Sequence, residues 1–441
     1  MMDQRKQPRF LRAFIAAALV VAYALTGNAQ GQLMLDITGG VERAVPIAVV
    51  PFQVEEGSAK PAHDIAEIIG ANLRRSGKFE PLSNRELIAR PSQLSDVRFQ
   101  QWRALGIDNL IIGAIRETDD GRYELRFELL DVYTQARVAG RRYRVSPQSL
   151  RPLAHNISDI IYEALTGVPG AFNTRISYIE VDHRDDNTRR HKLILADADG
   201  HNPETVLTSR QPIMSPAWSP DRRQIAYVSF EENRRSAVYI QTVATGERER
   251  IASFRGINSA PAWSPDGKRL ALTLSRDGSP NIYVYDVDTR DMTRITNSSA
   301  IDTEPTWSPD GKTLYFTSDR GGPPQIYRVS SNGGRVQRVT FEGSYNARPA
   351  LSPDGRRLAM VHRDDGGFRI AVMDLRTREL RVLTDGSNDE SPSFAPNGEM
   401  IVYSRIRGAQ SQLATVSLYG RANIGLPVLG DRVQNPSWSP R

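Results

Sequence analysis

Residues 260–272 read Ala-Pro-Ala-Trp-Ser-Pro-Asp-Gly-Lys-Arg-Leu-Ala-Leu, and related stretches occur five more times in the second half of the chain. Successive copies are separated by 45, 44, 44, 43 and 44 residues. A fixed period of this length is typical of the four-stranded blade of a β-propeller. The large apolar residue that sets the register is Trp218, Trp263, Trp307, Leu351, Phe394 or Trp438.

Each copy has the pattern of one blade. Pro-x-Trp-Ser predicts a short strand with one large anchor, and Pro-Asp-Gly predicts a tight turn. Proline presets φ in such a turn, aspartate bonds nearby backbone, and glycine accepts a positive φ. Two apolar strands follow in every unit, and a fourth, more polar stretch such as 293–296 suits an outer edge.

The two ends of the repeat region complement each other. Residues 175–180 and 192–196 look like the second and third strands of a unit that has no Pro-x-Trp-Ser before it. The last copy, 436–440, is a first strand with no unit after it. Joined, the two parts make one blade and leave no open sheet edge. We therefore predict a six-bladed all-β propeller over residues 169–441, closed by the C-terminal strand.

The first 29 residues have the three parts of a secretory signal. A basic stretch with Arg5, Lys6, Arg9 and Arg12 precedes the apolar run 13–25, and small residues at 27 and 29 suit a cleavage site. The run is shorter than a membrane-spanning helix needs. The chain carries a formal charge of +6, and with four Lys/Arg and one Asp in this segment the remainder carries +3. We expect an exported protein without a basic nucleic-acid surface.

Residues 30–45 separate the signal from the first folded domain. Leu33, Leu35 and Ile37 alternate with other residues before a Gly39-Gly40 pair, which is a short strand pattern. Two interpretations remain open. The segment is either an edge strand of the next domain or a flexible segment that pairs with a partner by adding a strand.

Residues 46–168 predict a small α/β domain. Apolar residues at 65, 68, 69 and 73 lie on one helical face that ends near Gly77, and those between 150 and 165 mark a closing helix that ends near Gly167. A further helix is expected over 99–105. Strands are expected at 46–50, 110–112 and 123–129. Residues 167–170 would connect this domain to the propeller.

Motifs of catalysis and cofactor binding do not occur. The sequence has no Gly-x-Ser-x-Gly, His-Glu-x-x-His, phosphate loop or dinucleotide fingerprint, and it has no cysteine. His183, His191 and His201 fit no familiar zinc spacing and indicate a surface turn. Asp197-Ala198-Asp199-Gly200 is interpreted as a turn between strands, and Arg189-Arg190 and Arg234-Arg235 as solvated hairpin tips. We expect no enzyme activity, metal or cofactor.

The order of these three parts resembles the TolB family of the Tol–Pal envelope system. The resemblance covers the whole chain and is carried by residues 46–52, 74–79, 165–167, 214–220 and 302–307. It implies a non-enzymatic periplasmic adaptor. Such an adaptor maintains outer-membrane integrity and supports constriction of that membrane in cell division, with other outer-membrane or peptidoglycan-associated proteins as further partners.

Two partner sites follow from the resemblance. The inner-membrane protein TolA would bind the segment after the signal, which comprises Gln32, Leu33, Met34, Leu35, Asp36, Ile37, Thr38, Gly39, Gly40, Val41, Glu42 and Arg43. The lipoprotein Pal would bind one open face of the propeller, around its central channel.

The residues just before each Pro-x-Trp-Ser strand are placed at the mouth of that channel. Among them Thr303, Glu304, Asn346 and Glu390 carry the most weight, because a ring of polar groups can bind a partner without being buried at a cost. Ile257 departs from the polar residue expected there and would shift partner preference. The candidate Pal-binding residues are Met214, Ser215, Ile257, Asn258, Ser259, Ala260, Asp302, Thr303, Glu304, Asn346, Ala347, Arg348, Asp389, Glu390, Ser391, Gln434 and Asn435.

Two other classes of protein stay open. A hydrolase gated by a propeller would need a catalytic domain with a nucleophile elbow, which the sequence does not contain. A propeller that binds a sugar or another small ligand would need a concave face lined by aromatic rings. The tryptophans of this chain lie inside the repeat motif, where packing between blades is expected to use them.

Overall fold

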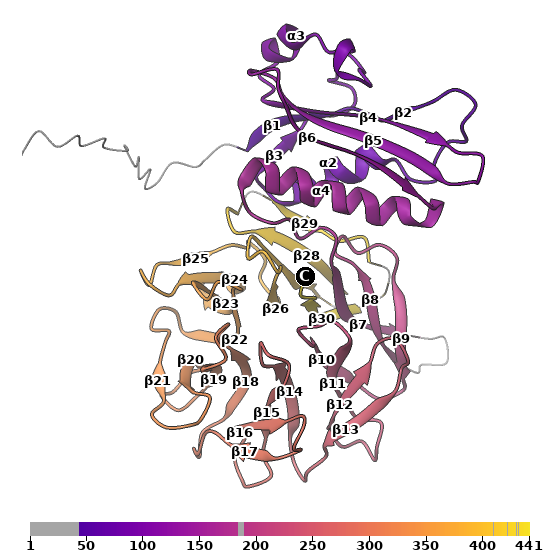
Figure 1. Ribbon diagram of the computed structural model, residues 1–441. Helices are drawn as coiled ribbons and strands as arrows, with labels where there is room; N and C mark the ends of the chain where they lie inside the picture. The colour runs from indigo at the N-terminus through magenta and orange to yellow at the C-terminus, as the bar shows by residue number, and fades with distance from the viewer. Residues whose placement is uncertain (1–43, 184–188, 409, 421, 429, 431) are drawn as a thin grey trace, which may run out of the picture. The chain divides into compact units, whose positions relative to one another are not determined.

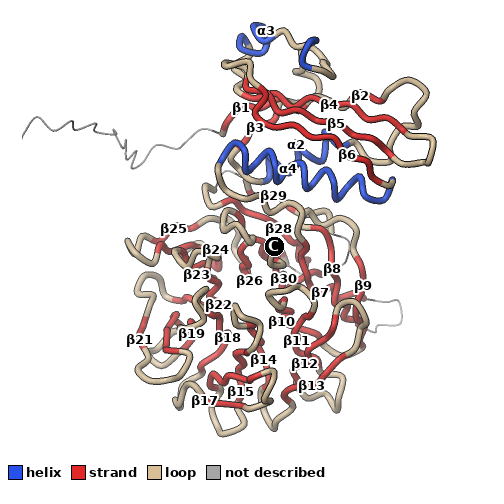
Figure 2. The backbone as a smooth tube through the Cα atoms, viewed as in Figure 1, coloured by secondary structure: helices blue, strands red, loops and turns tan. Residues whose placement is uncertain are grey.

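The computed structural model describes residues 44–183, 189–408, 410–420, 422–428, 430 and 432–441. Residues 44–441 form one compact unit. The expected signal segment, and the TolA-binding segment from Gln32 to Arg43, lie outside the described residues. Helices occur only before residue 167, and strands make up the regular structure of the remaining described chain (Figure 2).

The first part of the unit is built on a six-stranded mixed sheet of order β3-β1-β4-β5-β6, with β2 beside β4. The pairs β1/β3, β1/β4 and β2/β4 are parallel, whereas β4/β5 and β5/β6 are antiparallel. The expected strand at 46–50 begins one residue earlier. The strands are β1 (Val45–Val49), β2 (Gln53–Val54), β3 (Phe79–Pro81), β4 (Asn109–Glu117), β5 (Tyr123–Asp131) and β6 (Arg137–Val145).

Helices α2 (Ile65–Arg75) and α4 (Leu150–Thr166) pack on one face of this sheet (Figure 1). The alternation of strand side chains explains the two faces. Ile47 and Val49 of β1 enter the core with the two helices, whereas Ala48 and Val50 pack with Trp102 on the other side. Trp102 belongs to α3 (Phe99–Ala104), and two short turns of 3-10 helix, η1 (Leu94–Asp96) and η2 (Pro147–Ser149), complete this part.

Both long helices begin and end where the sequence predicts. Asp64 caps α2 by accepting a hydrogen bond from the Glu67 backbone N–H at 3.1 Å, and Arg74 and Arg75 occupy the last turn. Helix α4 stops at Gly167, which has a left-handed φ of 71°. Glycine adopts this conformation without steric cost, so the helix ends there.

The rest of the chain forms repeated antiparallel sheets. Four sheets contain four consecutive strands each. Their strands are β10 (Ile213–Trp218), β11 (Gln224–Ser229), β12 (Ala237–Thr242), β13 (Arg248–Ala252); β14 (Asn258–Trp263), β15 (Arg269–Leu274), β16 (Asn281–Asp286), β17 (Met292–Arg294); β18 (Asp302–Trp307), β19 (Thr313–Ser318), β20 (Gln325–Ser330), β21 (Gln337–Arg338); and β22 (Tyr345–Leu351), β23 (Arg357–Asp364), β24 (Gly367–Asp374), β25 (Leu380–Val382).

The remaining strands form a sheet of eight, in the order β26-β27-β28-β30-β7-β8-β9 with β29 beside β28. Strand β30 pairs antiparallel with β7, and Trp438 lies opposite Ile176. Among the described residues, one parallel pair, Ser411 with Arg432, joins β28 to β30. The strands are β7 (Arg175–His183), β8 (Arg189–Asp197), β9 (Glu204–Ser209), β26 (Asp389–Phe394), β27 (Met400–Arg407), β28 (Gln410–Ser417), β29 (Asn423–Gly425) and β30 (Arg432–Trp438).

The Ser-Pro-Asp-Gly motif closes the first hairpin of a repeat in the way its residue types predict. The Ser264 hydroxyl donates to Asp266 at 2.5 Å and accepts from the Arg269 backbone N–H at 2.9 Å. The hydrogen bond from Ser264 holds the pKa of Asp266 below its ordinary value. Gly267 takes a φ of 71°. The same bonds recur at Ser219, Ser308 and Ser352. The motif therefore repeats along the chain because each turn needs these residue types at these positions.

The tryptophans of the motif join neighbouring sheets. The Trp263 indole N–H donates to the Ala217 carbonyl at 3.2 Å, and that of Trp307 donates to the Ala262 carbonyl at 2.9 Å. Both rings are nearly buried. A tryptophan therefore contributes apolar area and one hydrogen bond to each of these junctions, which explains its place in the repeat.

Candidate functional site

The first strand of each repeat carries a bulge at the same position. In β10 the pairing with β11 shifts between Met214 and Ala217, and in β18 the pairing with β19 shifts between Thr303 and Thr306. Within each shift, the residue before the proline has a positive φ of 49–55°. We call these six residues the mouth ring: Ser215, Ala260, Glu304, Arg348, Ser391 and Asn435.

A left-handed conformation at a residue other than glycine costs of order 1 kcal/mol. Its recurrence at six equivalent positions indicates a built feature, since a bulge turns a side chain out of the regular alternation of its strand. Here the bulges direct the six ring residues toward one pocket, which they line.

The ring surrounds an open pocket of about 330 Å³, which we call the mouth pocket. The prolines of the repeat form much of its wall, together with the ring and a few neighbouring polar residues. The lining residues are Met214, Ser215, Pro216, Ser259, Ala260, Pro261, Thr303, Glu304, Pro305, Thr306, Arg348, Pro349, Ser391, Pro392, Ser393, Asn435, Pro436 and Ser437. No aromatic ring is among them, so the pocket lacks the stacking surface that sugars favour.

Five of the six ring residues are connected by hydrogen bonds. Glu304 pairs with Arg348, whose guanidinium donates to the Ser391 hydroxyl. The Asn435 amide also donates to Ser391, at 3.3 Å, and its oxygen accepts from the Ser215 backbone N–H at 3.5 Å. Ala260 interrupts the chain because its side chain is apolar. The mouth therefore has a prearranged polar rim that contains one carboxylate, Glu304, and one guanidinium, Arg348.

The lining brings together nine of the seventeen sequence-derived candidates. They are Met214, Ser215, Ser259, Ala260, Thr303, Glu304, Arg348, Ser391 and Asn435. Glu390 and Gln434 are half-buried and lie outside the lining, and Ile257 is 45% exposed in an adjoining groove.

The other five candidates are buried, and the polar side chains of Asn258, Asp302 and Asn346 bond other groups of the protein. Asn258, Asp302, Asn346 and Asp389 are 0% exposed, and Ala347 is nearly so. Both Asp302 oxygens accept from Arg320, at 2.8 and 2.7 Å. Asn346 bonds Gln325 at 2.8 Å and His362 at 2.9 Å. Through these internal bonds, Asp302 and Asn346 hold the backbone next to the mouth in place.

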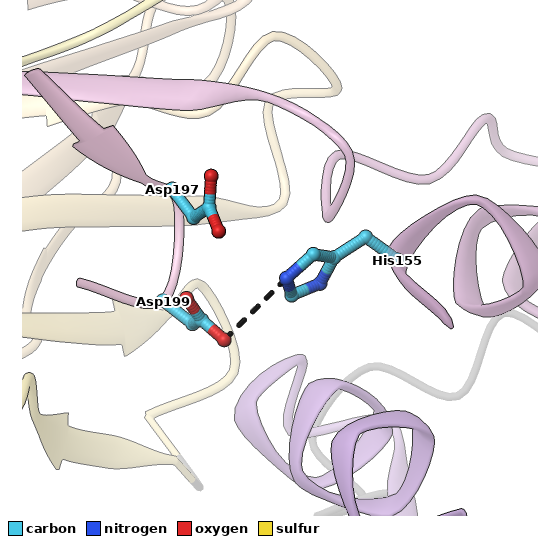
Figure 3. Close-up of side chains that lie close together, drawn as sticks. All are labelled: His155, Asp197 and Asp199. Atoms are coloured by element: carbon cyan, nitrogen blue, oxygen red, sulfur yellow. Dashed lines mark ion pairs between the residues drawn. The ribbon is translucent and has the colours of Figure 1, made fainter. Parts of the chain in front are cut away.

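A second group of polar residues lies between α4 and the turn after β8. Figure 3 shows the His155 ring directed from α4 toward Asp199, and the two groups are 3.6 Å apart. Arg151, which is 6% exposed, pairs with Asp197 at 3.3 Å and also with Asp199. His155, Asp197 and Asp199 have ligand atoms within 4.8 Å of one another, close enough to consider a metal ion.

Hydrogen bonding argues against that metal. Asn72 accepts from Arg75 through its oxygen, so its amide nitrogen faces His155 Nδ1 at 2.9 Å as a donor. Nδ1 must then accept, and the proton of the neutral ring lies on Nε2, which offers no lone pair toward the carboxylates. Arg151 already pairs with both carboxylates. Burial lowers the pKa of His155 to about 4, which keeps the ring neutral. We interpret the group as a structural junction.

The sequence interpretation of this region was incomplete. Residues 197–200 do connect β8 to β9, as predicted, but the Asp199 side chain is largely buried in the junction. His201 is half exposed, and the side chain of His183 lies outside the described residues. The signal that the sequence analysis missed is the spacing of Arg151 and His155, which lie four positions apart on a helix face predicted to be buried. Buried charged residues are rare unless they are paired, so this spacing indicates a polar contact.

Family models match both parts of the chain. A TolB amino-terminal domain matches residues 33–138, and a TolB β-propeller domain matches residues 162–441. The chain belongs to the TolB family. Curated relatives named "Tol-Pal system protein TolB" include one from Alkalilimnicola ehrlichii, 55% identical over 97% of this chain and all of the relative. Another, from Nitrosococcus oceani, is 57% identical over 96% of this chain and 97% of the relative.

A solved structure agrees with the family. The crystal structure of TolB from Acinetobacter baumannii is 44% identical, matches 91% of this chain and 98% of its own, and superposes with a TM-score of 0.83. The chain is thus a TolB-type Tol–Pal component with a TolB-like propeller. No helix in the described part of this TolB-family chain is long and apolar enough to cross a membrane.

Proposed function

We propose that this chain is a non-enzymatic periplasmic adaptor that binds Pal at the mouth pocket and TolA through residues 32–43. In this role it maintains outer-membrane integrity and supports membrane constriction during cell division. The proposal includes a secretory signal over residues 1–29, an α/β domain over 46–168 and a propeller over 169–441. The propeller would have six blades, with β30 of the eight-stranded sheet supplying the first strand of the blade formed with β7, β8 and β9.

The observation that carries the proposal is the hydrogen-bonded mouth ring. Left-handed residues recur at six equivalent positions around one pocket, and five of them are held by bonds to their neighbours. Such a rim is already ordered before a partner arrives, so binding would lose little conformational entropy. The pocket is open and lined by both polar and apolar atoms, which suits a protein surface better than a sugar, because no aromatic ring is in its lining.

Calorimetry tests the proposal with the chain starting at residue 30 and the periplasmic domain of Pal from the same organism. Glu304→Lys places a second cation beside Arg348 and breaks the ring, so we expect Pal affinity to fall by tenfold or more. Glu379→Lys is the matched control, since Glu379 is exposed and lies outside the mouth pocket. Wild-type affinity in Glu304→Lys would contradict the proposed site.

A chain starting at Val45 separates the two partners. It lacks the whole segment from Gln32 to Arg43 but keeps the mouth pocket. We expect this shorter chain to bind Pal and to lose binding to the periplasmic part of TolA. Retained TolA binding would overturn the role of the segment. Failure of the wild-type chain to bind Pal would overturn the adaptor function itself and favour a small-ligand role for the pocket.

A further inference from the structure

A second cavity, of about 520 Å³, adjoins the mouth pocket. We call it the basic groove. It lies between the hairpin that joins β11 to β12 and the loop before β14, and its wall includes Phe230, Arg234, Arg235, Arg255 and Ile257. Met214 lines both the groove and the mouth pocket. A partner seated on the mouth would therefore cover the groove as well.

The groove has three arginines that pair with no carboxylate of the described residues. Arg234, Arg235 and Arg255 are exposed, and none has a carboxylate of the described residues within ion-pair distance. The two acids of the hairpin are engaged elsewhere, because Glu231 pairs with Arg248 and Glu232 pairs with Arg250. Within the part of the chain that the structure describes, the groove is thus a site of positive charge without a counter-ion.

The backbone of the hairpin holds its arginines in place at some cost. Asn233 and Arg234 have positive φ values of 52° and 55°, and the Arg235 N–H donates to the Glu232 carbonyl at 3.0 Å. These features define a type I′ turn, in which glycine is favoured. The corresponding tips of other repeats do place glycine in the left-handed region, at Gly278, Gly322, Gly367 and Gly408. An arginine at this position is a departure that turn geometry does not require.

The opposite wall is also rigid. Asn258 is fully buried and donates to the carbonyls of Phe254 and Ser236, at 2.8 and 3.0 Å, so it ties the loop to the hairpin. The Ile257 N–H donates to the Ser275 hydroxyl at 2.7 Å. Ile257 itself remains 45% exposed and Met214 36% exposed. Neighbouring exposed apolar side chains on a fixed frame are typical of a contact surface.

We propose that the basic groove binds an apolar side chain flanked by carboxylates on the protein that occupies the mouth pocket. The inference rests on the proposed function, in which that protein is Pal. Its basis is charge complementarity, since three unpaired arginines surround an apolar wall, and continuity with the mouth through Met214. Charges at the rim of an interface set the rate and salt dependence of association, and the apolar contact slows dissociation.

Calorimetry and stopped-flow binding with the periplasmic domain of Pal test the groove. The variant R234E/R235E/R255E reverses its charge, and Arg335→Glu is the matched control. Arg335 is an exposed arginine on the turn between β20 and β21, and no carboxylate of the described residues pairs with it. Circular dichroism and thermal melting check that each variant is folded. If the triple variant does not fold, the single variants Arg255→Glu and Ile257→Asp are used in its place.

We expect the triple variant to bind about tenfold more weakly at low salt, as three lost exposed ion pairs would imply. The decrease should lie mainly in the association rate. It should shrink between about 0.05 and 0.3 M salt, because the charges become screened. Ile257→Asp should weaken binding at both salt concentrations, and Arg335→Glu should bind like the wild type.

Two results would overturn the inference, and they are distinguishable. If the wild type binds Pal and the groove variants bind equally well at both salt concentrations, Pal does not use the basic groove, but the proposed function stands. If the wild type itself does not bind Pal, the proposed function and the groove fail together.

Discussion

Glu304 and Arg348 lie on neighbouring first strands and contact each other twice. The Arg348 Nε is 3.1 Å from one Glu304 oxygen, and the Arg348 backbone N–H donates to the other at 3.0 Å. The Thr317 hydroxyl also donates to Glu304, at 2.8 Å. One carboxylate thus bonds the backbone and side chain of the next repeat, which links two sheets at the mouth.

A double-mutant cycle should measure the side-chain part of this contact. Glu304→Gln preserves the length of its side chain, Arg348→Gln removes the guanidinium, and the backbone N–H of residue 348 stays in both. The two side chains are 27% and 33% exposed, so we expect a coupling energy of about 0.5–1 kcal/mol from urea unfolding. Strict additivity of the two single changes would show that the pair contributes nothing.

The left-handed ring positions should tolerate glycine. Ala260 and Ala262 lie two residues apart on β14 and are both half-buried, but only Ala260 has a positive φ, of 49°. Ala260→Gly removes a strained conformation, which offsets the added freedom of the unfolded chain, so the free energy of unfolding should change by less than about 0.5 kcal/mol. Ala262→Gly should cost about 1 kcal/mol. Equal losses in denaturant unfolding would contradict strain at the ring.

The buried His155 should make the protein less stable in acid. Its pKa in the folded state is lowered to about 4 by burial, against an ordinary value of 6.5, with Arg75, Arg151 and His201 acting in the same direction and Asp199 opposing. The unfolded chain therefore takes up this proton first. Stability attributable to His155 is complete above pH 6.5 and falls by about 3 kcal/mol as the pH drops to 4.

His155→Gln should remove this part of the acid dependence, because glutamine stays neutral and can still accept from Asn72. Chemical unfolding at several pH values between 4 and 7 would measure the slope. His63→Gln is the control, since His63 is an exposed histidine. If His155→Gln and the wild type lose stability in parallel as the pH falls, His155 does not titrate as described.

Gly77 and Gly121 make a matched pair for close packing. Both have left-handed φ values, of 70° and 72°. A Cβ added at Gly77 would lie 2.4 Å from the Ser417 Oγ of β28, whereas one added at Gly121 would meet nothing within 4 Å. Gly121→Ala should cost about 1 kcal/mol from the backbone alone. Gly77→Ala should cost clearly more, by about 1–3 kcal/mol, because it also overpacks the contact. Similar melting temperatures for the Gly77→Ala and Gly121→Ala variants would show that the Ser417 side chain can move away from the added methyl group without cost.

Much of the fold could be predicted from patterns in the sequence. The 44-residue spacing and Ser-Pro-Asp-Gly chemistry place the hairpins of the repeats, because a turn depends on residues within five positions of each other. The long helices α2 and α4 followed from apolar spacing and their terminal residues. Strand β6 was missed, since its sequence from Arg137 to Val145 contains four arginines and lacks a clear alternation.

The candidate site was only partly predictable. Proximity to Pro-x-Trp-Ser located the mouth, and nine candidates do line the pocket. The same rule also selected Asn346 and Asp302, which are buried. Sequence position alone does not distinguish these residues, because a bulge turns one residue toward the pocket while its neighbour two positions earlier points into the loop beneath.

The sequence by itself determined the repeat, its turns and its register, since these depend on short-range bonding and on the periodicity of apolar residues. The tertiary structure decided which polar residues meet. The chain from Glu304 through Arg348, Ser391 and Asn435 to Ser215 joins residues 43 to 220 positions apart. The His155 junction likewise depends on α4 packing beside the turn after β8. Such contacts arise only when separate elements pack together, so no local pattern encodes them.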